Sequence, residues 1–132
     1  MTKRVLTTNA PMKTLRVFVV DDIPDVADAL ALLLSVKGHH TQVAYGGQEA
    51  VETIAEFAPD AAFIDIGMPG KDGFQVAVEL RVMFINKPLL LVSISGWGSE
   101  AIKAKSKTSG FDCHLIKPAM SSDLEAVLSQ LQ

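Results

Sequence analysis

The sequence predicts a doubly wound α/β fold, in which helices cover both faces of a parallel sheet. Two observations lead to this prediction. Short runs rich in β-branched and apolar residues alternate five times with segments whose apolar residues recur at helical spacing. The short runs are also continuously apolar, which is typical of strands that are buried on both faces of a parallel (βα)5 sheet. Right-handed crossovers then place ligand sites beyond the carboxyl ends of the strands.

The five predicted strands are short, and helical segments separate them along the chain. Their ranges are 16–20, 42–44, 61–64, 89–94 and 113–116. Four of the helical segments place apolar residues on one face of a helix. These residues are Val26, Leu30, Leu33 and Leu34; Val51, Ile54, Ala55 and Ala58; Val76, Leu80, Met83 and Phe84; and Leu124, Val127, Leu128 and Leu131.

The helix predicted between residues 98 and 109 has little apolar surface to bury. Ile102 is its only large apolar residue, and three lysines are spread along it. A helix of this kind is expected to open more easily than its neighbours.

Length and charge limit the organisation of the chain. At 132 residues it is about one domain long, and it contains a single cysteine and no apolar run long enough to cross a membrane. Residues 1–16 carry a charge of +4, whereas the whole chain carries −3. We predict a flexible basic arm over residues 1–14 and one domain over 15–132, in the cytoplasm, with no membrane contact. The basic cluster is too small to predict nucleic-acid binding.

Four of the five predicted strands end at polar or charged residues. These are Asp21 and Asp22 after the first strand, Asp65 after the third, Ser95 after the fourth, and Lys117 with Pro118 after the fifth. Three crowded carboxylates repel, by about 4 kcal/mol for each close pair at an effective dielectric constant near 20. Oxygen ligands favour compensation by Mg²⁺, with Mn²⁺ as a substitute. Lys117 and Ser95 can hold phosphoryl oxygens, which makes Asp65 a candidate carboxylate nucleophile.

Four motifs in this order resemble the receiver domain of two-component response regulators. They are the pair DD at residues 21–22, FIDIGMPGKDGF at 63–74, VSISGWG at 92–98 and HLIKP at 114–118. The resemblance covers residues 15–131, and the sequences of these motifs are especially similar to those of receivers attached to hybrid histidine kinases. It implies a flavodoxin-like strand order, 2-1-3-4-5.

The resemblance also implies roles for individual residues. Asp65 matches the phosphoacceptor, which takes a phosphoryl group from a histidine of a sensor kinase or a histidine phosphotransfer protein. The metal ligands would be Asp22, Asp65 and the Gly67 carbonyl, with Asp21 acting through water. Ser95 matches the switch hydroxyl and Lys117 the phosphoryl-binding lysine, which Pro118 commonly follows through a cis peptide bond.

Three positions depart from the usual pattern of these receivers or remain open. His114 stands where the second switch residue is often Tyr or Phe, so the rotation of an aromatic ring is in doubt, although we expect His114 to serve the switch surface. Ser95 replaces the commoner Thr and lacks the methyl group that stiffens the rotamer. Trp97 either shields an acyl phosphate from water or packs on the surface of its loop.

Three other interpretations remain open at this stage. A haloacid-dehalogenase-like phosphohydrolase also uses an aspartate nucleophile, but it needs an acid two residues later, where this chain has Gly67. A receiver fold can also act as a binding module that does not need phosphorylation, although such modules usually lose one of the site residues. The chain could be part of a hybrid kinase, but the arm and the end after the last helix favour a stand-alone regulator.

The predicted output is a contact with another protein. We expect a downstream protein target and catalysis of nothing beyond the chain's own phosphorylation and dephosphorylation. The chain is expected to be a monomer or a weak homodimer through its fourth and fifth helices.

Overall fold

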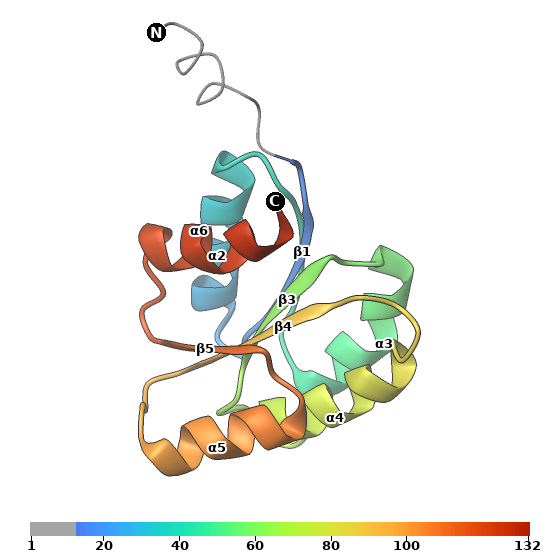
Figure 1. Ribbon diagram of the computed structural model, residues 1–132, viewed down its shortest axis with the longest axis vertical. Helices are drawn as coiled ribbons and strands as arrows, with labels where there is room; N and C mark the ends of the chain where they lie inside the picture. Colours follow the sequence, from blue (N-terminus) through green and yellow to red (C-terminus); the bar gives the residue numbers. More distant parts are fainter. Residues whose placement is uncertain (1–12) are drawn as a thin grey trace, which may run out of the picture.

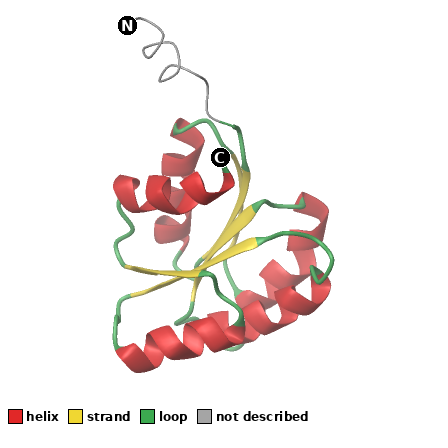
Figure 2. Ribbon diagram, viewed as in Figure 1, coloured by secondary structure: helices red, strands yellow, loops and turns green. Residues whose placement is uncertain are grey.

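A computed structural model describes residues 13–132 as five strands that alternate with five α-helices and end in a short 3₁₀ helix (Figures 1 and 2). The strands are β1 (Arg16–Val20), β2 (His40–Ala44), β3 (Ala61–Asp65), β4 (Leu90–Ser95) and β5 (Cys113–Ile116). The helices are α2 (Pro24–Val36), α3 (Gly47–Phe57), α4 (Gly73–Met83), α5 (Glu100–Ser109), α6 (Ser121–Leu128) and the 3₁₀ helix η1 (Ser129–Leu131).

The sheet is parallel throughout, and its strand order is β2-β1-β3-β4-β5, as predicted. Helices α2 and α6 cover one face, and α3, α4 and α5 cover the other (Figure 1). The chain passes from β1 to β2 at one edge and then returns past β1 to β3, so the strand order reverses between β1 and β3. This is the crevice in which doubly wound folds bind ligands.

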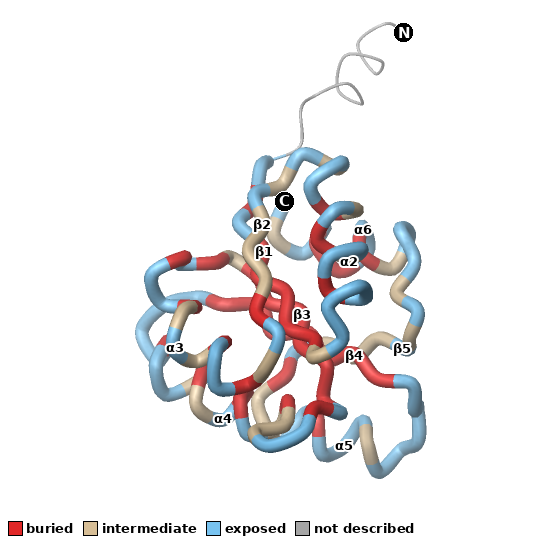
Figure 3. The backbone as a smooth tube through the Cα atoms, turned by 180° about the vertical axis from the view of Figure 1, so that it is seen from behind, coloured by how far each residue is buried: buried red, intermediate tan, exposed pale blue. Residues whose placement is uncertain are grey.

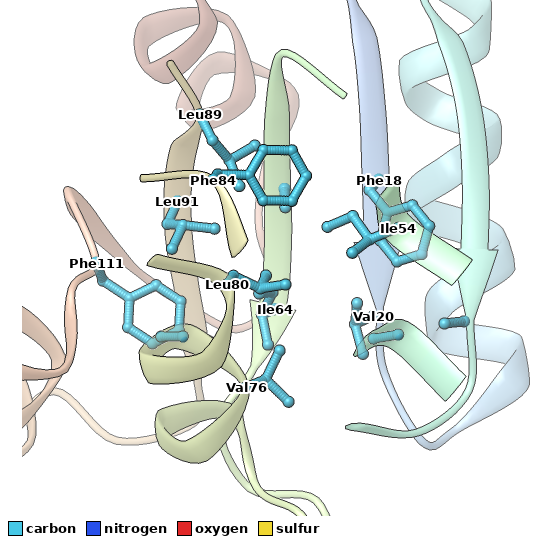
Figure 4. Packing of buried hydrophobic residues seen from close by; sticks show 14 of the residues in the cluster. Phe18, Val20, Ile54, Ile64, Val76, Leu80, Phe84, Leu89, Leu91 and Phe111 are labelled. Carbon is cyan, nitrogen blue, oxygen red and sulfur yellow. The ribbon is translucent and has the colours of Figure 1, made fainter. Parts of the chain in front are cut away.

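Two apolar clusters hold the helices on the sheet. Figure 4 shows the first cluster, where Phe18 and Ile64 of the strands meet Ile54 of α3 and Leu80 of α4. The second lies under α2 and α6 and includes Phe63 of β3. The central strands β1, β3 and β4 are therefore buried on both faces (Figure 3). Burial of each large apolar side chain stabilises the fold by about 1.5–3 kcal/mol, so the strand ends form a rigid base for a site.

The predicted helical faces need correction, although each helix exists. Val26 is 39% exposed and Met83 is 41% exposed, and Ala55 and Ala58 lie in exposed positions. In α2 Leu34 is buried as predicted, and Leu30 and Leu33 are partly buried, but the rest of the buried face is formed by Ala27 and Ala31. Small side chains let a helix approach the sheet closely, and a pattern of large apolar residues does not detect them. The predicted face of the last helix is correct for Leu124, Val127 and Leu128.

Most of the predicted basic arm, residues 1–12, lies outside the described residues. The backbone of Lys13 exchanges two hydrogen bonds with the side chain of Gln132, which joins the start of the described chain to its end. Among residues 13–132, no helix combines the length and the apolar character needed to span a membrane.

Acidification is expected to destabilise the fold through His39. Its Nδ1 accepts a hydrogen bond from the Leu15 N–H at 3.1 Å, which requires an unprotonated Nδ1. Burial, and then the charge of Lys37, lower the pKa of His39 below its ordinary value of 6.5. The unfolded chain therefore binds this proton more tightly than the folded chain. The stabilisation is complete above pH 6.5 and is lost as the pH falls toward the lowered pKa of the folded state.

Urea unfolding of the native chain and the His39→Gln variant, from about pH 7.5 to about pH 5.5, measures this contribution. The native midpoint should fall more than that of His39→Gln, whereas the exposed neighbour His40, changed to Gln, should leave the native pH dependence in place. Equal falls in the native chain and His39→Gln would contradict the prediction.

Candidate functional site

Three carboxylates meet where the strand order reverses. Asp21 follows β1, Asp22 comes next, and Asp65 is the last residue of β3. One carboxylate oxygen from each lies within 4.8 Å of the others. Asp21 and Asp65 are only 4% and 5% exposed, and Asp22 is half-buried. The structure thus brings together the three acids that the sequence placed at the strand ends.

Backbone groups orient two of these acids. The Ile23 N–H donates to Asp21 Oδ1 at 3.0 Å, and the Gly67 N–H donates to Asp65 Oδ1 at 3.0 Å. In both cases the donor lies two residues after the acid, in the loop that follows the strand. Each carboxylate is therefore held by the turn of its own loop, with its Oδ2 free to contact other groups. The role of the Gly67 carbonyl as a metal ligand stays a prediction.

Lys117 reaches two of the carboxylates from the other side of the site. Its Nζ lies 3.0 Å from Asp21 Oδ2 and 3.3 Å from Asp65 Oδ2. Lys117 follows β5, two strands away from β3, and its N–H donates to the Ser95 carbonyl at 2.8 Å. The peptide bond between Lys117 and Pro118 is cis. The long lysine side chain thus spans from the edge strand to the crevice between β1 and β3.

The charges of the site shift two pKa values. Burial, with a further contribution from Asp21, raises the pKa of Asp65 above its ordinary value, although the Gly67 N–H and Lys117 oppose the shift. Burial alone would lower the pKa of Lys117, but the hydrogen bond to Asp21 and the charges of Asp65 and Asp21 raise it. Lys117 therefore stays protonated, and its charge adds to the Gly67 N–H in opposing the rise in the pKa of Asp65.

The donor set fits a hard divalent cation. Asp21, Asp22 and Asp65 offer carboxylate oxygens only, and Lys117 compensates for one of their three negative charges. Mg²⁺ takes few carboxylates, keeps several waters and leaves positions for substrate phosphate. The three acids can therefore hold Mg²⁺.

Ser95 ends β4, and its side chain is turned toward its own loop. Its hydroxyl donates to the Trp97 carbonyl at 2.7 Å and accepts from the Trp97 N–H at 2.9 Å. Trp97 is 74% exposed, and its packing on the surface of the loop stays a prediction. Its backbone is the part that contacts Ser95. The shielding of an acyl phosphate by Trp97 stays a prediction.

His114 lies beside the same loop. Its Nε2 is 3.2 Å from the Trp97 carbonyl, and its Nδ1 is 2.7 Å from Ser93 Oγ. Ser93 in turn contacts Ser106 of α5. Neither Ser93 nor Ser106 stood among the predicted site residues. A signal existed for Ser93, because it is a lone hydroxyl in the middle of an apolar strand; Ser106 resembles any other polar residue of a surface helix.

Comparisons with known proteins agree with this geometry. A family model described as the response regulator receiver domain matches residues 17–129. The receiver domain of a putative response regulator, NarL from Mycobacterium tuberculosis, is 31% identical, with a TM-score of 0.78, and the match covers 90% of this chain and 97% of that one.

Two further solved structures are similar. A putative response regulator from Chloroflexus aurantiacus is 27% identical with a TM-score of 0.79, over 89% of this chain and 99% of that one. The chemotaxis protein CheY4 of Vibrio cholerae has the same fold at 22% identity and a TM-score of 0.83, over 91% and 100% of the two chains. The special similarity to receivers of hybrid histidine kinases stays a prediction. The matched family model, the strand order and the acidic crevice together establish that this chain belongs to the response regulator receiver domain family.

Proposed function

We propose that this receiver accepts a phosphoryl group on Asp65 from a phosphohistidine and then changes a protein-binding surface. The observation that carries the proposal is the bridge from Lys117 Nζ to Asp21 and Asp65, at 3.0 and 3.3 Å, beside a third carboxylate. Structural ion pairs are usually balanced, whereas this cluster keeps an excess of negative charge in a buried crevice. Such a cluster is typical of a site that binds a cation and a phosphoryl group.

The residues of the crevice would divide the chemistry among them. An oxygen of Asp65 forms a bond to phosphorus while the P–N bond of the phosphohistidine breaks, and the imidazole leaves with the electron pair. Asp65 loses its own charge when it becomes the acyl phosphate. Lys117 would therefore exchange its contact with Asp65 for a contact with the phosphoryl oxygens. Mg²⁺ held by Asp22, Asp65 and the Gly67 carbonyl, with Asp21 acting through water, would neutralise charge on the transferring group.

A groove beside the crevice supports a protein as the phosphoryl donor. It has a volume of about 580 Å³ and is lined by Asp21, by Val26 and Leu30 of α2, and by Lys117 and Pro118. Ile23, next to the acids, is 50% exposed. An apolar surface that reaches Asp21 and Lys117 suits the docking of a sensor histidine kinase or a histidine phosphotransfer protein, whose histidine must come within bonding distance of the Asp65 carboxylate.

The surface that a downstream protein would bind is the one that the Ser95 hydroxyl can alter through the loop that follows it. When its hydroxyl turns from the Trp97 carbonyl to a phosphoryl oxygen, the loop at residues 96–99 loses two hydrogen bonds. This loop leads directly into α5, which buries little. A downstream protein would read α5, β5 and α6, and a weak homodimer through α5 and α6, the fourth and fifth helices, would use the same surface. We expect the reaction in the cytoplasm, with no turnover of other substrates.

Intact-mass spectrometry with acetyl phosphate tests the proposal. The native chain should gain one phosphoryl group in the presence of Mg²⁺ and none with EDTA. Asp65→Asn should gain none, because an amide is not a nucleophile here, whereas the exposed Asp25, changed to Asn, should react like the native chain.

An adduct that survives in Asp65→Asn would overturn the assignment of the acceptor. Absence of any adduct on folded native protein, together with failure to bind beryllofluoride, would favour a binding module that works without phosphorylation. Continuous release of phosphate from added phosphomonoesters would instead favour a phosphohydrolase.

A further inference from the structure

A buried hydroxyl interrupts the apolar strand β4. Ser93 has 0% exposure, and the alternation along the strand turns it to the same face as Leu91, where α5 packs. A hydroxyl buried in an apolar setting costs free energy unless it has hydrogen-bond partners. Ser93 Oγ has three: Ser106 Oγ of α5, His114 Nδ1 at 2.7 Å and the Cys113 carbonyl at 3.2 Å. These partners come from two different elements, α5 and β5.

The direction of the hydrogen bonds follows from the Trp97 carbonyl. A carbonyl only accepts, so His114 Nε2, at 3.2 Å from it, carries the proton. In the neutral ring Nδ1 is then an acceptor, and the Ser93 hydroxyl donates to it. Ser93 in turn accepts from Ser106. The bonds therefore run in one direction from α5 to the loop after β4, and they end at the carbonyl that also accepts from Ser95.

This chain of bonds is a main attachment of α5 to the sheet. Ser106 is the only fully buried residue of α5, and Ile102 is its one partly buried apolar contact with the core. Figure 3 shows the rest of the helix mostly exposed. With so little apolar area buried, a hydrogen bond at Ser106 is a large share of what fixes the position of this helix.

The same atoms permit a second arrangement. If the Trp97 carbonyl moves when Ser95 leaves it, His114 loses its acceptor and the ring is free to turn. The Ser93 hydroxyl can then donate to the Cys113 carbonyl, which already lies at 3.2 Å. Ser93 thus donates a hydrogen bond in both arrangements. When its hydroxyl turns from His114 to the Cys113 carbonyl, however, the lone pairs that accept from Ser106 point in a new direction. Two satisfied arrangements are what a switch element requires.

We propose that Ser93 and Ser106 are positioning residues that couple the Ser95 hydroxyl to α5 through His114. This inference rests on the proposed function, because phosphorylation of Asp65 is what would draw Ser95 away. In this proposal His114 acts by accepting a hydrogen bond from Ser93 and donating one to the Trp97 carbonyl. The relay consists of Ser106, Ser93, His114, the Trp97 carbonyl and Ser95.

Hydrogen exchange of α5, followed by mass spectrometry with and without Mg²⁺ and beryllofluoride, tests the coupling. In the native chain beryllofluoride should change α5 exchange by about three- to tenfold, the effect of one net hydrogen bond. Ser93→Ala should lose most of this response, and Ser93→Thr, which restores the hydroxyl, should regain it. Fluorine NMR of bound beryllofluoride should show equal occupancy in all three proteins, because Ser93 does not contact the crevice.

A native-like response in Ser93→Ala would overturn the coupling, and so would a failure of Thr to restore it. Nitrogen NMR of the imidazole provides an independent test in the resting state. The native chain should show His114 protonated on Nε2, and Ser93→Ala should shift only the Nδ1 signal. A proton on His114 Nδ1 in the native chain would overturn the relay and leave the proposed phosphorylation of Asp65 unaffected. If native protein binds no beryllofluoride, the proposed function fails and the coupling fails with it.

Discussion

Replacing Lys117 with Met is expected to abolish phosphoryl acceptance while the crevice keeps its affinity for Mg²⁺. The methionine side chain has a similar length and no charge, so the phosphoryl group loses its fixed cation. Removal of one preorganised electrostatic partner typically slows group transfer by about 100- to 1,000-fold. The pKa of Asp65, which burial already raises and Lys117 lowers, should rise further, so less of the carboxylate is ionised. Both effects act in the same direction.

The same change should not weaken Mg²⁺ binding at neutral pH. Lys117 Nζ forms ion pairs with Asp21 Oδ2 and Asp65 Oδ2, so it competes with a metal ion for these oxygens. Calorimetric titration with Mg²⁺ should therefore give an affinity at least equal to that of the native chain. Mass spectrometry with acetyl phosphate should show the loss of the adduct. The control is Lys87→Met, which changes an exposed lysine far from the acids in sequence and should behave like the native chain.

A Lys117→Met variant that still forms the adduct at the native rate would contradict the role of the lysine. A variant that loses both the adduct and Mg²⁺ binding would point to collapse of the crevice instead, because only a displaced set of carboxylates accounts for both losses. Circular dichroism of the variant separates this outcome from global unfolding.

The strands and the positions of the acids could be predicted from the sequence. β1 and β5 begin and end at the predicted residues, and the other three differ by at most two residues at either end. Strand ends are local signals, because an apolar run stops at a charge. Once the strands are parallel, Asp21, Asp65 and Lys117 must come to the same edge, so their meeting needs no knowledge of side-chain packing.

The inward faces of the helices and the relay could not be predicted in this way. Ala27 and Ala31 face the sheet in α2 because they allow a close approach, which depends on the partner surface and not on hydrophobicity alone. The direction of the Ser95 hydroxyl depends on the fold of residues 96–97, and the contact between Ser93 and Ser106 joins two elements. These features are set by tertiary distances that a single sequence does not contain.

Gly73→Ala is expected to be among the most destabilising single substitutions in this fold. Gly73 is the first residue of α4, and Asp72 caps the helix before it. A β-carbon on Gly73 would lie 2.6 Å from Ile66 Cα and 2.7 Å from the Asp65 carbonyl oxygen. Both neighbours are backbone atoms at the end of the central strand β3, so neither can move aside as a flexible side chain would. The helix and the strand must separate.

The cost should be about 2–3 kcal/mol, at the upper end for the insertion of one methyl group into packed structure. Urea unfolding should show a lower midpoint with an unchanged slope, and the melting temperature should fall by roughly 6–15 °C. Because the displaced carbonyl belongs to Asp65, the folded variant should also accept phosphate more slowly. Gly96→Ala is the control, since a β-carbon there meets nothing within 4 Å. Equal stability of Gly73→Ala and Gly96→Ala would mean that α4 can shift on β3 at little cost, and that Asp65 is not held in place by this helix.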